Sequence, residues 1–126
     1  MAGYSFEDLE VYQEAREYRK KMYALSKRLP PEEKYNVANQ VRDAARSLTN
    51  NIAEGHGRFH YQENIRFLRV TRGSLEELID DVNICIDEKY ADVETLVKLK
   101  EEGFRLLHKI NSYTAYLKRR KEGEAN

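Results

Sequence analysis

The sequence predicts an all-α fold, in which four antiparallel helices form an up-down-up-down bundle and make up one domain over residues 1–126. Apolar residues recur at every third or fourth position through most of the chain, which is the period of a helix that buries one face. The chain contains only two prolines, Pro30 and Pro31, and six glycines, which are fewer turn residues than a β-rich fold of this length needs.

The first helix is expected over residues 6–29. Ser5 and Asp8 have the spacing of a capping box, in which each side chain accepts a hydrogen bond from a backbone N–H of the first turn. Pro30 ends the helix, because the residue before a proline is pushed out of the α region. The residues expected in the core alternate between spacings of four and three: Val11, Ala15, Tyr18, Met22, Leu25 and Leu29.

The second helix is expected over residues 32–53. Gly55 and Gly57 follow it, and glycine adopts positive φ at low cost, so we expect a left-handed stop at Gly55 and a tight reversal after it. The core stripe of this helix is predicted to be Val37, Val41, Ala44 or Ala45, Leu48 and Ile52. A hydrogen-bonded clamp across the turn is expected from Asn51, Glu54 and Arg58.

The third helix is expected over residues 61–88. Arg72 falls on its apolar stripe and lies next to Gly73. A charge in such a position must pair or reach water, and Glu54 and Glu77 are the expected partners. The stripe consists of Tyr61, Ile65, Leu68, Arg72, Leu75, Ile79, Val82 and Ile86.

The fourth helix is expected over residues 92–120, with Asp92 as its N-cap. Residues 122–126 are expected to be a disordered tail. The apolar positions of this helix are Leu96, Leu99, Gly103, Leu106, Ile110, Tyr113 and Leu117.

The charges sum to zero, with 22 basic and 22 acidic side chains, whereas a non-specific nucleic-acid binder usually has a clear positive excess. The distribution is uneven, however, because Arg66, Arg69 and Arg72 share a helix face while acidic residues dominate the second half of the same helix. The candidate residues for a nucleic-acid surface or a subunit interface are Arg42, Arg46, Arg58, Arg66, Arg69, Arg72, Lys118, Arg119 and Arg120.

Two interpretations of these arginines stay open. They pair with carboxylates of a neighbouring subunit and so specify an oligomer, or they repeat around the oligomer and bind a nucleic-acid backbone. The residues assigned only to the structure of the turn and the third helix are Asn51, Glu54, Gly55, Gly57 and Gly73.

No catalytic, metal or cofactor site is predicted. A di-metal centre in a helical bundle needs Glu-x-x-His pairs, and the chain contains none. His56, His60 and Glu63 have a spacing that could hold zinc, but beside a glycine-rich turn the signal is weak. No candidate nucleophile has a general base at a sequence spacing that would predict a catalytic pair. We therefore expect a protein that is not an enzyme.

The single cysteine, Cys85, cannot form a disulfide within the chain and is expected to be buried in a reducing compartment. No signal peptide and no run of apolar residues long enough for a membrane span is recognised, so a cytoplasmic location without a membrane partner is expected. Nine tyrosines, several of them off the apolar stripes, favour self-association.

Three segments give the chain a family resemblance: FEDLEVYQEA at residues 6–15, NIAEGHGR at residues 51–58, and RFLRVTRGSLEEL at residues 66–78. With them the chain resembles the four helix bundle protein family, first noticed in intervening sequences of bacterial large-subunit ribosomal RNA genes. The resemblance implies a homopentamer. It also implies a relationship to the accessory variability determinant of diversity-generating retroelements, a pentameric protein that works with a reverse transcriptase and its RNA.

The expected function is a non-enzymatic, oligomeric helical scaffold or adaptor that presents arginines to RNA or DNA. One alternative is a structural or protein-interaction oligomer with no nucleic-acid role. Another is a retroelement accessory protein that acts with a reverse transcriptase.

Overall fold

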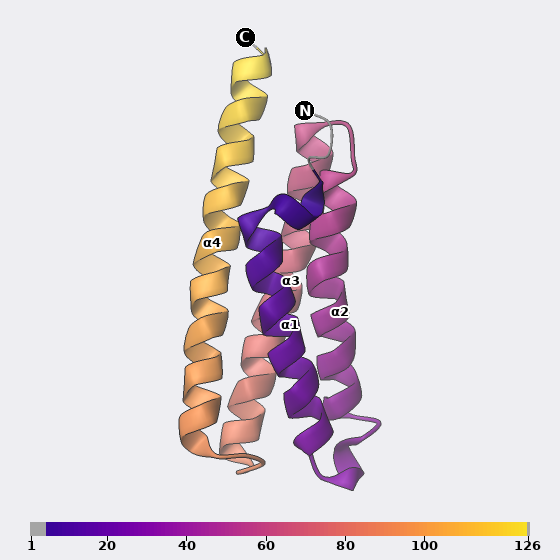
Figure 1. The fold of residues 1–126 in the computed structure, drawn as a ribbon, viewed down its shortest axis with the longest axis vertical. Coiled ribbons are helices and arrows are strands. Elements are labelled where there is room, and N and C mark those ends of the chain that lie inside the picture. The colour runs from indigo at the N-terminus through magenta and orange to yellow at the C-terminus, as the bar shows by residue number, and fades with distance from the viewer. Residues whose placement is uncertain (1–4, 126) are drawn as a thin grey trace.

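The computed structural model describes residues 5–125, and this part of the chain is all-helical, with four long helices and no strand, as predicted (Figure 1). Successive long helices run in opposite directions (Figure 1). The elements in chain order are η1 (Phe6–Asp8), α1 (Glu10–Arg28), η2 (Pro31–Glu33), α2 (Val37–His56), α3 (Tyr61–Asp87) and α4 (Val93–Ala125), where η denotes a short 3-10 helix.

The four helices pack in a square order. Helix α3 contacts α2 and α4 over most of its length, and α1 closes the square by contacting α2 and α4 on the other side. One side of α3 is therefore left outside the bundle. Among the described residues, no helix combines the length and the apolar character that a membrane span requires.

The core follows the predicted stripes of α1 and α2. All six stripe residues of the first helix are buried, with Ala15 and Met22 fully so. In α2 the side chains of Val41, Ala45 and Leu48 are also completely enclosed. Burial of such aliphatic side chains is the main favourable contribution to folding.

The start of the first helix differs from the expected 6–29. The capping box forms, since Ser5 N–H donates to Asp8 Oδ2 at 2.9 Å and Ser5 Oγ accepts from Glu7 N–H at 3.1 Å, but it caps η1. Leu9 then adopts an extended conformation (φ −70°, ψ 128°), which separates η1 from α1. The Leu9 side chain is buried in the core.

The second helix begins and ends later than the expected 32–53. Pro31–Glu33 forms η2, and α2 starts only at Val37. The expected left-handed stop at Gly55 is wrong, because Gly55 is a buried residue within α2, and Gly57 caps the helix with φ −74°. None of the glycines in the described part of the chain lies in the left-handed region.

The predicted core stripe of the third helix is wrong at one position. Thr71, which is fully buried and donates to the Leu48 carbonyl oxygen at 3.4 Å, occupies the place expected for Arg72. Arg72 is exposed. The predicted stripe alternates spacings of four and three and so has a period of 3.5 residues, whereas a straight α-helix has 3.6 residues per turn. The buried face of a straight helix therefore shifts gradually relative to the predicted stripe.

The fourth helix has the predicted cap, since Asp92 Oδ2 accepts from Thr95 N–H at 3.0 Å. The expected disorder of residues 122–126 is wrong for residues 122–125, which continue α4; Asn126 lies outside the described residues. Lysine, arginine, glutamate and alanine dominate this end, and all are good helix formers. Helix α4 extends past the other helices here (Figure 1).

Candidate nucleic-acid interface

The candidate interface lies at the end of the bundle that contains the α2–α3 link, where α2 and α3 approach each other closely (Figure 1). A Cβ atom placed on Gly55 would stand 2.8 Å from Asn64 Oδ1 and 2.9 Å from Phe67 Cβ. Only glycine permits this approach. It holds the Phe67 ring beside Arg58, which lies in the link.

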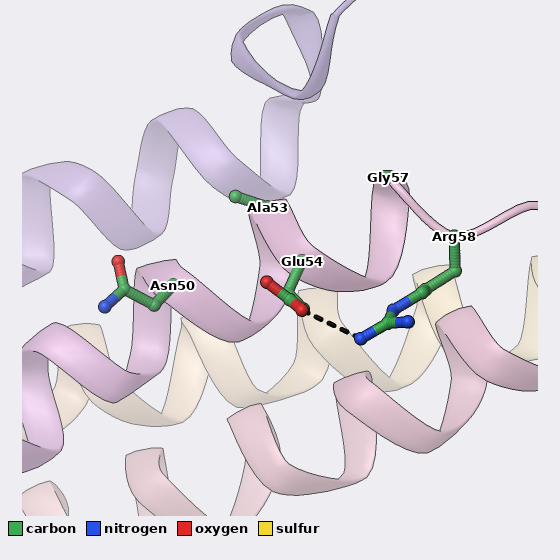
Figure 2. Close-up of a pocket in the computed structure, with 5 residues that line it drawn as sticks. All are labelled: Asn50, Ala53, Glu54, Gly57 and Arg58. Atoms are coloured by element: carbon green, nitrogen blue, oxygen red, sulfur yellow. Dashed lines mark hydrogen bonds and ion pairs between the residues drawn. The ribbon is translucent and has the colours of Figure 1, made fainter.

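Arg58 makes two contacts at this end. Its guanidinium donates to Glu54 Oε1 at 2.9 Å, and Figure 2 shows the two side chains pointing toward each other along the rim of an open hollow. The guanidinium carbon also lies 5.0 Å from the centre of the Phe67 ring, a cation–π distance. The Glu54–Arg58 part of the expected clamp is therefore present.

Asn51 does not take part in that clamp. Its side-chain amide donates to the Ser47 carbonyl oxygen at 2.8 Å and to Ser47 Oγ at 2.9 Å. Ser47 Oγ in turn lies 2.9 Å from Ser74 Oγ, which joins α2 to α3. Asn51 thus supports the packing of these two helices.

Arg66 also contacts the Phe67 ring, with its guanidinium carbon 4.9 Å from the ring centre. It donates to both carboxylate oxygens of Glu63, at 2.9 and 3.1 Å. This hydrogen bond, together with the charges of Arg66, Arg58 and His60, lowers the pKa of Glu63. The Arg58–Glu54 and Arg66–Glu63 ion pairs are both exposed and join residues three or four positions apart. Such pairs contribute little to stability. They also leave both guanidinium groups open to solvent.

The remaining candidate arginines of α2 and α3 lie along the sides of the bundle. Arg69 and Arg72 are exposed on α3, and within the described residues neither forms an ion pair. The predicted pairing of Arg72 with Glu54 is wrong, because Glu54 binds Arg58. Arg42 is half-buried on α2, and Arg46 pairs with Asp43 at 2.9 Å.

The basic end of α4 joins the site. Lys121 donates to Gln62 Oε1, which ties α4 to the first turn of α3. A hollow of about 400 Å³ lies beside this contact, and its lining residues are Tyr61, Arg119, Arg120 and Gly123. Lys118 is exposed one residue before them.

Aromatic side chains complete this end, and the sequence did not reveal that they come together. Phe59 is 95% exposed and contacts His60 edge to face, at 5.3 Å between ring centres. Tyr113 and Tyr116 of α4 are stacked, with their ring centres 6.2 Å apart and an angle of 14° between the ring planes. A second hollow of about 320 Å³ lies between the link and α4; its lining residues are Leu9, His56, Arg58, Phe59, His60, Tyr61, Asn64, Tyr113, Tyr116 and Leu117.

We call this surface the aromatic basic end and define it by Arg58, Phe59, His60, Tyr61, Tyr113, Tyr116, Lys118, Arg119, Arg120 and Lys121. Its chemistry suits unpaired nucleotides. Exposed aromatic faces stack on bases, and lysine and arginine bind phosphates. The run Phe59-His60-Tyr61 was visible in the sequence, but its proximity to α4 follows only from the antiparallel packing.

Other chemistry has little support in the described residues. No three His, Cys, Asp or Glu side chains gather there as a metal site, so His56, His60 and Glu63 do not form one. Cys85 is fully buried, and burial, with the charges of Asp81 and Glu33, raises the pKa of its thiol to about 11. A thiol of this kind stays protonated at neutral pH and is a poor nucleophile.

Comparison with known proteins identifies the family. The chain matches the family described as 23S rRNA-intervening sequence protein over residues 7–112, and no curated protein matches it. The matched region includes the α2–α3 link but ends before the Tyr113–Tyr116 stack and the basic end of α4. The matched span covers most of the four-helix fold, so the chain belongs to the 23S rRNA-intervening sequence protein family.

Proposed function

We propose that this protein is a non-enzymatic, oligomeric helical scaffold that binds unpaired RNA at the aromatic basic end. The observation that carries the proposal is the hollow between the α2–α3 link and α4, where exposed aromatic rings lie next to Arg58. The description of the family refers to an intervening sequence in a ribosomal RNA, so RNA is the nucleic acid chosen for the test.

The geometry favours single strands and loops over a duplex. The Phe59 ring is almost wholly exposed and Tyr116 is 46% exposed, so both can stack on a base. Stacking on an aromatic side chain contributes about 1–3 kcal/mol per base and requires that the base be unpaired. Bases within a duplex are stacked on each other and do not offer that face.

The charges at this end supply phosphate contacts of moderate strength. Arg119 and Lys118 are exposed on the projecting end of α4. Arg58 adds a cation that is shared with Glu54. With about three phosphates contacted, the logarithm of the binding constant is expected to fall with the logarithm of salt concentration with a slope of about −2.

Self-association would strengthen such modest binding. The outer side of α4 carries Val93, Val97 and Phe104, spaced by four and seven, which are 59%, 41% and 51% exposed. An apolar stripe of this kind is typical of a subunit contact. In the homopentamer that the family resemblance implies, several aromatic basic ends would act on one RNA through avidity.

The experiment is fluorescence anisotropy with a labelled polyuridine oligomer, over a series of salt concentrations. Phe59→Ala and Tyr116→Ala are each expected to weaken binding about tenfold, the effect of losing one stacked base. The matched control is Tyr35→Ala, because Tyr35 is 81% exposed but lies in the α1–α2 link at the opposite end of the bundle.

The proposal is wrong if the unchanged protein fails to bind the oligomer at low salt, where phosphate contacts are strongest. An equal loss in the Tyr35 control would also overturn it. If the unchanged protein does not bind RNA, the alternative function, a protein-interaction oligomer without nucleic acid, is preferred. The pairing of Arg58 and Arg66 with carboxylates of their own chain is the observation that favours it.

A further inference from the structure

We infer that the hollow between the end of α1 and the start of α4 binds a small amphiphilic carboxylate, of the class of the medium-chain fatty acids. Its volume of about 300 Å³ lies at the lower end of the range for small-molecule sites. It is at the opposite end of the bundle from the α2–α3 link (Figure 1) and shares no residue with the aromatic basic end. We call it the α1–α4 hollow and define it by Ala24, Leu25, Arg28, Leu96, Lys98 and Leu99.

The α1–α4 hollow opens where ion pairs no longer join the two helices. Farther along the same seam, Lys109 of α4 donates to Glu10 of α1 at 2.8 Å. Lys21 Nζ lies 2.6 Å from Glu102 Oε2, and both residues line the hollow, so this ion pair bounds it toward the middle of the bundle. Among the described residues, no ion pair joins α1 to α4 beyond that point. Ala24, three residues later on α1, is too short to fill the space that is left.

Leucine side chains form the floor of the hollow. Leu25 of α1 and Leu96 and Leu99 of α4 line it, and all three are also part of the hydrophobic core. They are 5%, 0% and 6% exposed, so the packing of the core fixes their positions. A hydrocarbon group that covers this floor is removed from water, which is the main favourable contribution to binding an apolar ligand.

The charges around the hollow call for an anion. Arg28 and Lys98 line it and are exposed, and within the described part of the chain neither forms an ion pair. Glu102 is the only acid among the described residues that line the hollow, and it is bound to Lys21. An arginine guanidinium binds a carboxylate through two parallel hydrogen bonds. The hollow is therefore complementary to a ligand with a carboxylate at one end and an apolar body.

The dimensions of the hollow limit the length of the apolar body. Arg28 and Lys21 lie seven residues apart on α1, or about 10 Å, which is close to the length of an extended chain of about eight carbons. With its carboxylate at Arg28, such a chain would cover the leucine floor and end at the Lys21–Glu102 pair. No aromatic side chain is among the described residues that line the hollow, so it offers no platform for a nucleic-acid base.

The first test is isothermal titration calorimetry of the full chain with octanoate, octanamide and hexanoate. Octanoate is expected to bind about tenfold more tightly than octanamide, which has the same chain but no charge for Arg28. Hexanoate is expected to bind about tenfold more weakly than octanoate, because it leaves two methylene groups' worth of the leucine floor uncovered.

The second test uses two variants of the hollow with matched controls. Ala24→Leu fills the hollow and is expected to weaken the binding of both octanoate and octanamide at least about tenfold. Arg28→Gln is expected to lower the affinity for octanoate to that for octanamide, with octanamide unaffected. The controls are Ala115→Leu and Arg119→Gln, which change an exposed alanine and an exposed arginine near the other end of α4 and should leave octanoate binding unchanged. Circular dichroism checks that each variant folds.

The inference is overturned if octanoate does not bind, or if it binds no more tightly than octanamide. It is also overturned if Arg119→Gln weakens octanoate binding as much as Arg28→Gln does, because the anion would then bind at the aromatic basic end. A folded Ala24→Leu variant with unchanged affinity for octanoate would exclude the hollow as the site. The same Ala24→Leu variant is expected to keep its affinity for the polyuridine oligomer, so this inference and the proposed function are tested independently.

Discussion

Gly55 of α2 and Asn64 of α3 lie in direct contact, since a Cβ atom on residue 55 would stand 2.8 Å from Asn64 Oδ1 and 3.2 Å from the Asn64 carbonyl oxygen. Gly55→Ala is therefore expected to lower the free energy of unfolding by about 1–3 kcal/mol, the usual cost of overpacking. Urea unfolding measures this. Gly57→Ala is the control, because its nearest neighbour would lie at 3.5 Å, an ordinary contact distance. Equal stability of the two variants would contradict the prediction.

Gly73→Ala should have the opposite effect. The new methyl group meets no atom of the chain, and alanine has a higher helix propensity than glycine. The free energy of unfolding of the dilute protein is expected to rise by about 0.5–1 kcal/mol. Thermal unfolding at low protein concentration tests this without interference from self-association, and a loss of stability would show that Gly73 has a packing role within the subunit.

Asp81 predicts a pH dependence of stability. Its side chain is 4% exposed, and its Oδ2 atom has no hydrogen-bond partner among the described residues. Burial, with the nearby charges of Glu77 and Asp80, raises the pKa of Asp81 to about 7 from an ordinary value of 3.8. The folded state therefore holds its proton more tightly than the unfolded state.

The sign of the effect follows from this difference. The protonated Asp81 stabilises the fold fully below pH 3.8, and this contribution is lost as the pH rises through about 7. Asp81→Asn, which carries no charge at any pH, should raise the free energy of unfolding at pH 8 by on the order of 2 kcal/mol. Urea unfolding at a series of pH values from 4 to 8 gives the free energy of unfolding as a function of pH. This dependence on pH should be weaker for Asp81→Asn than for the unchanged protein. Asp87 is exposed, so Asp87→Asn should retain the pH dependence of the unchanged protein.

Arg72 and Thr71 make an adjacent pair with opposite sensitivities. Arg72→Ala is expected to change the free energy of unfolding by less than about 0.5 kcal/mol, because the side chain is exposed. Thr71→Arg should destabilise the fold by more than about 3 kcal/mol, because it places an unpaired charge in a fully buried position. Differential scanning fluorimetry of the two variants is sufficient. If the Arg72 variant melts well below the unchanged protein, Arg72 makes a stabilising contact that an exposed side chain would not provide.

The sequence predicted the fold because helix period is a local property. The spacing of the apolar residues in α1 and the Asp92 cap depend only on neighbouring residues, and both are confirmed. The position of Arg72 was mispredicted, because the predicted stripe has a period of 3.5 residues and the helix one of 3.6, so a stripe position can fall one residue away from the buried one, here Thr71. Gly55 was assigned to a turn, because glycine in a sequence does not distinguish a left-handed stop from a close helix contact.

The site was less predictable than the fold. The Glu54–Arg58 pair lies within one turn and could be anticipated from its spacing of four. The hollow between Phe59 and Tyr116 brings together residues that are far apart in the chain. Their proximity depends on the antiparallel packing of α3 and α4, which brings the end of α4 beside the α2–α3 link.

The projecting end of α4 has a consequence for local unfolding. Among residues 93–123, Leu117 is the last buried residue of α4, and the turns that follow it are tied to the bundle by the Lys121–Gln62 hydrogen bond and by no buried side chain, so they take little part in the cooperative unfolding of the core. Their backbone amides are held only by helix hydrogen bonds open to water, and these turns can open and close in hydrogen exchange while the bundle stays intact. The cations at this end are thus carried by a segment with a stability of its own, and a ligand bound there would slow exchange at these amides first.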